Sequence, residues 1–159
     1  MINIRQGTIE DFKKLDKPWA WGKSKWQREA QKNYIEGITK GTQEFLVVED
    51  GNKILGEIHI FWDKPKDHDE ADGKKRAYLC AMRIHPDSRG QGLGTKLMEV
   101  ALKRIKENGF TESTIGAYVD EIKNQELYKK WGFTELVKET WEKTSEYRAK
   151  YFLYLQKLT

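Results

Sequence analysis

The sequence predicts one α/β domain in which a mixed sheet is flanked by helices. Short apolar runs between turn-forming residues indicate strands, and longer stretches with apolar residues at helical spacing indicate helices. They follow one another as a strand, two helices, three strands, a helix, a strand, a helix and two strands, an order typical of a sheet covered by helices. The length of 159 residues suits a single domain over residues 1–159.

The strands are predicted from alternation or from short apolar runs. Ile2 and Ile4 alternate with polar neighbours, as in an edge strand, and residues 49–52 form a hairpin turn. Residues 63–75 contain turn formers and charges, so a loop is expected there. The strands are expected near residues 2–4, 45–48, 54–62, 78–84, 113–119, 133–137 and 151–158.

Helix ends are predicted from capping residues. The capping-box pattern of residues 8–11 opens a first helix, and a second spans 24–38 before Gly41. A third begins near Leu93, since apolar residues recur at helical spacing up to Asn108 and Gly109. A short fourth helix is expected over 124–131.

The composition indicates a globular protein without a strong bias in charge or in apolar content. Charged residues make up 34% and apolar residues 38%, and the net charge of +4 suits a polyanionic small molecule but is too dispersed for nucleic acid. Cys80 is the single cysteine, so no internal disulfide is expected. No apolar stretch reaches the length of a membrane span, and the N-terminus lacks the apolar region of a signal peptide, so we expect a cytoplasmic protein.

A glycine-rich turn is the most informative feature of the chain. Residues Arg89, Gly90, Gln91, Gly92, Leu93, Gly94 and Thr95 connect an apolar run ending at residue 84 with the start of a helix. The first turn of a helix presents N–H groups without partners, and glycines let the backbone approach a diphosphate closely. The spacing matches neither a dinucleotide fingerprint nor a P-loop. We therefore expect a different anion-binding turn at residues 89–95.

These residues resemble the GNAT (Gcn5-related) N-acetyltransferase family. Its acetyl-CoA motif consists of an apolar strand, a residue before Pro, and R-G-x-G-x-G/A leading into a helix, and residues 82–94 follow this pattern. A second element, L-Y-x-x-x-G-F, is similar to residues 127–133. The two motifs stand in the family's order.

The resemblance implies the GNAT fold, a mixed and mostly antiparallel central sheet flanked by helices. It implies an acyltransferase that moves an acetyl group from acetyl-CoA directly to a primary amine in a ternary complex. Residues 89–95 would bind the diphosphate, and the backbone around Met82, Arg83 and Ile84 would pair with the pantetheine arm and donate to the thioester oxygen. The resemblance also implies that dimers are frequent, although the sequence specifies no interface.

Tyr128 is the predicted general acid, because by resemblance its hydroxyl lies near the CoA sulfur. The alternative is that Tyr128 only packs its helix against the sheet. Family members commonly have an asparagine seven residues before this tyrosine, where the chain has Glu121. Asn124 either takes over the pantetheine contact or only caps the helix.

Glu57 is the predicted general base that removes a proton from the amine. Alternation places it on one face of its strand with His59, and a carboxylate in an apolar cleft suits this task. The alternative is that both residues lie on a solvated face. Cys80 as a covalent acetyl carrier is disfavoured, since a lone cysteine in an apolar strand is usually a small buried residue.

The acceptor site is expected around Trp19, Trp21, Trp26 and Tyr34, since the family usually builds it in this segment and aromatic faces bind cationic amines. Part of this cluster is expected in the core. The acidic loop, which we define as Asp63, Asp67, Asp69, Glu70 and Asp72, either steers a cationic acceptor or is simply solvated. His68 has no partner at ligand spacing, so no metal is expected.

Three acceptor and function classes stay open at the level of sequence. A small cationic amine is favoured, while a protein lysine or N-terminus is an alternative acceptor. A module that binds acyl-CoA without catalysis is the alternative from a different class. Whether acyl groups other than acetyl are used is not specified by the sequence.

Overall fold

A computed structural model describes residues 1–143 and 147–159. The elements are β1 (Ile2–Gln6), α1 (Asp11–Lys14), α2 (Lys25–Lys40), β2 (Gln43–Asp50), β3 (Lys53–Phe61), β4 (Arg76–Ile84), a 3₁₀ turn η1 (Pro86–Ser88), α3 (Leu93–Glu107), β5 (Glu112–Tyr118), α4 (Ile122–Lys130), β6 (Glu135–Lys143) and β7 (Arg148–Lys157). Their order is the predicted one.

Hydrogen bonds join the strands in the order β1-β2-β3-β4-β5-β7-β6. β4 and β5 are parallel, whereas β1 with β2, β5 with β7, and β6 with β7 are antiparallel. The predicted mixed, mostly antiparallel sheet flanked by helices is therefore confirmed. β1 is an edge strand, as its alternation indicated. The chain divides into two compact units, residues 1–60 with 81–103 and residues 61–80 with 104–159.

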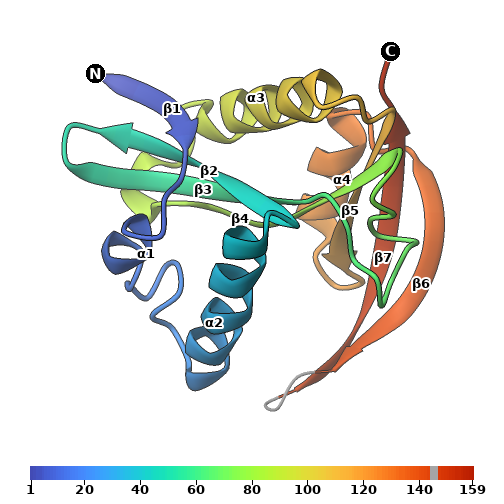
Figure 1. The fold of residues 1–159 in the computed structure, drawn as a ribbon, viewed down its shortest axis with the longest axis horizontal. Helices are drawn as coiled ribbons and strands as arrows, with labels where there is room; N and C mark the ends of the chain where they lie inside the picture. Colours follow the sequence, from blue (N-terminus) through green and yellow to red (C-terminus); the bar gives the residue numbers. More distant parts are fainter. Residues whose placement is uncertain (144–146) are drawn as a thin grey trace. The chain divides into compact units, whose positions relative to one another are not determined.

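In the first unit, α1 and α2 lie on one face of β2 and β3, and the beginning of α3 lies on the other face (Figure 1). α2 has the predicted caps, because the Ser24 hydroxyl accepts from the Gln27 N–H and Gly41 ends the helix in the left-handed conformation. The α1 side has an aromatic core in which Phe12, Trp21 and Phe45 pack together. This core fixes the segment in which the acceptor site is expected.

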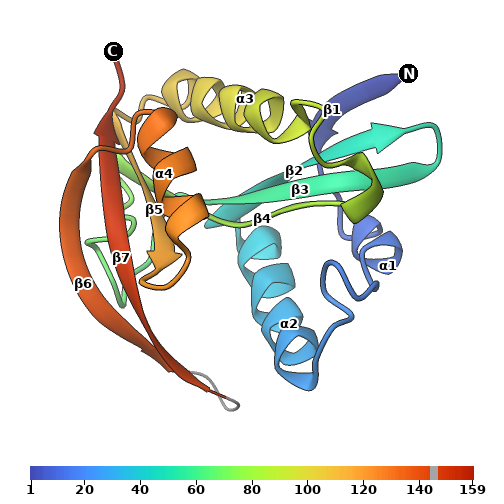
Figure 2. The same ribbon diagram turned by 180° about the vertical axis from the view of Figure 1, so that it is seen from behind.

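In the second unit, β5 pairs with β7 from Glu112↔Lys157 to Tyr118↔Tyr151. α4 packs on β5, and β6 and β7 form a long ribbon (Figure 2). The Phe133 side chain, from the L-Y-x-x-x-G-F segment, is fully buried. Gly132 has φ of +103°, a conformation that other residues rarely adopt, so this glycine permits the turn after α4.

Some element boundaries differ from the predictions. α4 begins at Ile122 instead of 124, and β6 continues to Lys143, well past residue 137. β6 alternates exposed and half-buried residues, and one of its exposed charges, Glu139, forms an ion pair with Lys150 of β7. Such an edge strand has little apolar periodicity, so the sequence pattern ended too early. Within the described residues, no helix is long and apolar enough to cross a bilayer.

Candidate active site

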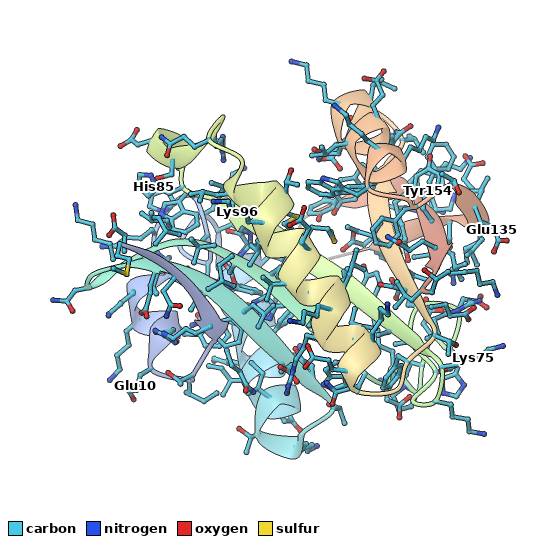
Figure 3. The ribbon with its side chains drawn as sticks, turned by 90° about the horizontal axis from the view of Figure 1, so that it is seen from above. Glu10, Lys75, His85, Lys96, Glu135 and Tyr154 are labelled. Carbon is cyan, nitrogen blue, oxygen red and sulfur yellow. The ribbon has the colours of Figure 1, made fainter. Side chains whose placement is uncertain are left out.

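The first part of the candidate site is the turn that follows β4. The His85 N–H donates to the Leu55 carbonyl at 2.7 Å, and the His85 Nδ1 accepts from the Asp87 N–H at 3.1 Å. Pro86 begins η1, where its fixed φ suits the first position of a helical turn. These contacts hold the segment around His85 in place between β3 and the glycines of residues 89–95. Figure 3 marks His85 before the glycine turn and Lys96 on α3 after it.

Gly90 and Gly92 give the turn its open shape. Both have φ of +78°, and an added Cβ at either position would meet no atom within 4 Å. The Lys96 N–H is bonded to the Gly92 carbonyl at 3.1 Å, so α3 starts immediately afterwards. The first turn of α3 contains no acidic residue. The helix start therefore combines unpaired N–H groups, a favourable dipole and open space, which together suit an anion.

Arg89 adds a charge beside this turn. Its side chain is exposed, and its Nε donates to the Ile84 carbonyl at 3.1 Å, which holds the guanidinium close to the end of β4. The two terminal nitrogens can then make charge-assisted contacts with phosphate oxygens. Residues 89–95 thus combine a positive charge, an open backbone and a helix start, which are the features of an anion-binding turn.

The end of β4 departs from regular strand geometry. β4 pairs with β5 from Arg76↔Glu112 to Leu79↔Ile115. Ala81 follows with φ of +49°, and it is the one non-glycine residue with positive φ in the described chain. Such a conformation costs about 1 to 3 kcal/mol and is often found at functional sites. It immediately precedes Met82, Arg83 and Ile84, whose backbone is predicted to contact the substrate.

Glu57 lies at the centre of a buried polar cluster in the first unit. Its side chain has no exposed area, and its Oε1 accepts from the Trp21 Nε1–H at 2.9 Å and contacts His59 Nε2 at 2.7 Å. Its Oε2 accepts from an Arg83 Nη1–H at 3.2 Å. The alternative of a solvated face for Glu57 and His59 is therefore wrong. The sheet face that carries them is covered by the aromatic core.

His59 is neutral in this cluster. Burial lowers the pKa of His59, and the adjacent Glu57 only partly opposes this effect. The imidazole stacks on Phe45 with centroids 4.7 Å apart and meets the edge of Tyr34 at 4.9 Å. Its Nδ1 has no hydrogen-bond partner in the described residues. The contacts therefore assign the proton of the neutral ring to Nε2, which donates to Glu57.

The tryptophan segment divides between core and surface. Trp21 is buried and carries the Arg83 guanidinium over its ring, with Cζ 4.5 Å from the centroid. Trp19 is half-buried and meets the His85 ring edge at 5.3 Å, and Trp26 on α2 is also half-buried. The prediction that part of this cluster belongs to the core is confirmed by Trp21.

Tyr128 belongs to the second unit and is half-buried on α4. Its ring stacks with Trp131 at 6.0 Å, and its hydroxyl makes no hydrogen bond to any described residue. Burial, together with the charges of Glu121 and Cys80, raises the pKa of Tyr128 to about 12. The hydroxyl is therefore protonated at neutral pH and has a free proton to donate.

Asn124 and Glu121 contact each other at the start of α4. The Asn124 Nδ2 donates to Glu121 Oε2 at 3.1 Å, and Glu121 Oε1 accepts from the Tyr118 N–H at 3.0 Å. Glu121, not Asn124, is the N-cap residue, so the expectation that Asn124 caps the helix is wrong. The amide oxygen of Asn124 keeps its capacity to accept a bond.

The acidic loop is more ordered than a solvated charge run. Lys138 contacts both Asp67 at 3.0 Å and Asp69 at 3.3 Å, and Lys64 contacts the buried Glu70 at 2.7 Å. Burial alone would raise the pKa of Asp67, but the Lys138 ammonium lowers it below its usual value. The expectation of a simply solvated loop is wrong for Glu70.

Asp72 and Cys80 are two further residues of the second unit that the sequence analysis considered. Asp72 accepts from three successive backbone N–H groups, at residues 74 to 76, so this carboxylate also serves the fold. Cys80 is half-buried, less so than expected for a small core residue. The described residues hold no group of three or more side chains arranged to bind a metal.

Comparison with known proteins agrees with this arrangement. The strand, the open glycine turn and the helix start are the elements in which the sequence resembles the GNAT N-acetyltransferases. The model of the Acetyltransferase (GNAT) family matches residues 8–133, so the chain belongs to this family. The prediction of an acyltransferase is thereby confirmed. No curated protein sequence matches the chain.

Solved structures share the fold at low sequence identity. An N-acetyltransferase from Staphylococcus aureus Mu50 is 13% identical, with a TM-score of 0.73 over 100% of this chain and 99% of that one. A GNAT family acetyltransferase from Elizabethkingia anophelis with acetyl-CoA bound is 17% identical, with a TM-score of 0.66 over 99% and 98%. The PaiA N-acetyltransferase from Thermoplasma acidophilum in complex with coenzyme A is 19% identical, with a TM-score of 0.68 over 99% of each chain.

Sequence reasoning missed the side chain of Arg83 and its contacts with Glu57 and Trp21. Alternation along β3 did group Glu57 with His59. Arg83 is a charged residue between the apolar neighbours Met82 and Ile84, which is a signal for a buried ion pair. The partner of such a residue depends on strand pairing, so the sequence alone did not identify it.

Proposed function

We propose that the protein transfers an acetyl group from acetyl-CoA to a primary amine, by direct transfer in a ternary complex. The observation that carries this proposal is the open turn of residues 89–95 at the start of α3. Its positive-φ glycines, free N–H groups and Arg89 fit a diphosphate. Similar structures that contain acetyl-CoA or coenzyme A support this choice of donor.

The groups around the thioester are proposed as follows. The backbone N–H groups near Met82 and Ile84 donate to the carbonyl oxygen and stabilise the charge that develops there. Tyr128 donates its proton to the departing sulfur. An ordinary thiol has a pKa of about 8.5, so the Tyr128 hydroxyl is the weaker acid, and it donates most effectively once the C–S bond is largely broken and negative charge has developed on the sulfur. Asn124 is proposed to contact the pantetheine arm.

The role of Glu57 as base stays a prediction. Its oxygens already contact Trp21, His59 and Arg83, and the side chain has no exposed area. An acceptor amine would reach this carboxylate only after one of these partners moved. The same contacts favour a second role, in which Glu57 positions the Arg83 guanidinium.

The other sequence predictions keep their status as proposals. They are a single domain over residues 1–159, a cytoplasmic location, no metal, no nucleic-acid or membrane partner, and a small cationic acceptor amine. The acidic loop gives little support to steering of the acceptor, because Asp67 and Asp69 are paired with Lys138. A homodimer, as the family resemblance implies, also stays a proposal.

Free-thiol release from acetyl-CoA tests the proposal. It would be measured with polyamines, aminoglycosides, amino acids and lysine peptides, and acetyl-CoA binding would be followed in parallel by calorimetry. Release that depends on one acceptor class is expected. Tight donor binding without release from any acceptor would favour the non-catalytic acyl-CoA module, and no donor binding would contradict the assignment of the glycine turn.

A further inference from the structure

The Arg83 guanidinium is held in place by contacts within the protein. It lies over the Trp21 ring at 4.5 Å and donates from Nη1 to Glu57 Oε2 at 3.2 Å. A stacked face and an ion pair leave the flat group little freedom to rotate. Glu57 is itself fixed by Trp21 and His59, so the ion pair rests on a rigid base.

The same guanidinium keeps unused donors. A guanidinium has N–H groups on Nε and on both terminal nitrogens, and within the described residues only the bond to Glu57 is formed. The Arg83 side chain is 20% exposed, so these donors are largely removed from bulk water yet still reachable. Partly desolvated donors without acceptors are costly, and an anionic ligand would satisfy them.

The location of Arg83 connects it with the proposed reaction. Its neighbours Met82 and Ile84 are the residues whose backbone is proposed to hold the thioester. Its side chain lies on the sheet face that Trp21 and the α1–α2 segment cover, which is the proposed acceptor region. A group bound by this guanidinium therefore lies on the acceptor side of β4, one residue away from the proposed oxyanion donors.

We infer that Arg83 binds a carboxylate of the acceptor, so the substrate is a small amine that also carries a carboxylate, such as an amino acid. The inference rests on the proposed function and narrows its acceptor class. The planar fork of arginine matches a carboxylate through two parallel hydrogen bonds, whereas an ammonium group offers it no acceptor. A carboxylate held there leaves the amine of the same molecule free to attack.

Matched acceptor pairs test the inference. Thiol release would be measured for several amino acids and for their amides, which have the same amine and side chain but lack the carboxylate. In the wild type, kcat/KM for the acid is expected to exceed that for the amide by about tenfold or more, as for a charge-assisted contact. Equal values, or faster reaction of the amides, would overturn the inference while thiol release itself upheld the proposed function.

Variants of Arg83 then test whether this side chain causes the preference for acids over amides. Arg83→Gln is expected to remove the acid preference, because it should raise KM for the acid much more than KM for the amide. Arg83→Lys keeps the charge but loses the fork, so it is expected to restore part of the preference. The matched control is Arg89→Gln, which removes the same charge from the donor side and is expected to leave the acid preference unchanged.

Each outcome is decisive. If either Arg83 variant does not fold, as thermal unfolding would show, the wild-type comparison of acids and amides still decides. Loss of the preference in Arg83→Gln but not in Arg89→Gln supports the inference. A preference that survives Arg83→Gln would contradict it, because another group would then bind the carboxylate. Thiol release from neither acids, amides nor other amines would contradict the proposed function itself.

Discussion

The glycine turn of the first unit and the acidic loop of the second are both charged surface segments, but their polar groups differ in whether they have partners. In residues 89–95, the helix start leaves N–H groups open and Arg89 keeps exposed donors. In the acidic loop, Asp67, Asp69 and Glu70 are paired with lysines. We therefore expect a ligand at the segment whose polar groups lack partners, and the number of charges in a segment is a poor guide to binding.

The largest expected effect comes from closing the open turn. Gly92→Asp puts a carboxylate beside the diphosphate and forces a side chain into φ of +78°, so acetyl-CoA affinity should fall by about 100-fold or more. Isothermal calorimetry measures this directly. Gly92→Ala separates strain from charge and should cost about tenfold or less.

Gly51→Asp is the matched control for this experiment. Gly51 lies in the hairpin turn between β2 and β3, with φ of +62° and with open space around an added Cβ. It suffers the same kind of backbone strain and gains the same charge, but it is remote in sequence from the glycine turn. An equal loss of affinity in both aspartate variants would contradict the assignment of residues 89–95.

Tyr128→Phe is expected to have the next largest effect. It removes a free hydroxyl and keeps the ring that stacks on Trp131, so kcat should fall by about 10- to 100-fold while acetyl-CoA affinity stays nearly constant. Steady-state kinetics and calorimetry check the two halves. An unchanged kcat would mean that water or another group protonates the thiolate.

The pH dependence of kcat is a second test of the role of Tyr128. Because the pKa of Tyr128 is about 12, its hydroxyl stays protonated over the range in which activity can be measured. Between about pH 8 and pH 10, which lies below the pKa of Tyr128, wild-type kcat should therefore show no decline caused by ionisation of this residue. An alkaline decline that disappears in Tyr128→Phe would contradict this account.

Replacing the paired carboxylate of Asp11 should affect the stability of the fold instead of ligand binding. The Asp11 carboxylate accepts from the guanidinium of Arg5 at 2.9 Å and from the Thr8 N–H at 2.8 Å. Burial alone would raise the pKa of Asp11, but these bonds lower it. Asp11→Asn should reduce the free energy of unfolding by about 1 to 2 kcal/mol, as for loss of charge-assisted hydrogen bonds.

The pH dependence of this effect has a definite sign. A lowered pKa in the folded state gives stability that is present above the unfolded pKa of Asp, about 4, and that is lost as pH falls through the folded value. The difference between wild type and Asp11→Asn should therefore be complete at neutral pH and shrink below about pH 4. Urea unfolding at several pH values measures it, and a pH-independent difference would contradict the role of the charge.

The smallest effect is expected in the acidic loop. Replacing Asp67 and Asp69 together by asparagine removes charges that Lys138 already compensates, so the acceptor KM should change by less than about twofold. Initial-rate kinetics at low and high salt check this. A large, salt-dependent rise in KM for cationic acceptors would show that the loop does steer them.

Much of the fold and the geometry of the glycine turn could be predicted from the sequence, because both depend on local signals. Ser24 and Gly41 mark the ends of α2, and the glycines at 90 and 92 mark a turn that only special backbone angles allow. The partners of Glu57 could not be predicted, because Trp21 and Arg83 come from distant parts of the chain. The alternative in which Asn124 only caps α4 is wrong because the helix starts at Ile122, ahead of the apolar pattern.

The most direct test of the central claim is a titration of the nitrogen-15-labelled protein with acetyl-CoA, followed by the amide signals of its glycines. We predict that the signals of Gly90, Gly92 and Gly94 shift strongly and saturate together, whereas those of Gly41 and Gly51 stay in place. Saturable binding of acetyl-CoA without a shift at Gly90, Gly92 and Gly94 would contradict the claim that the open glycine turn binds the donor.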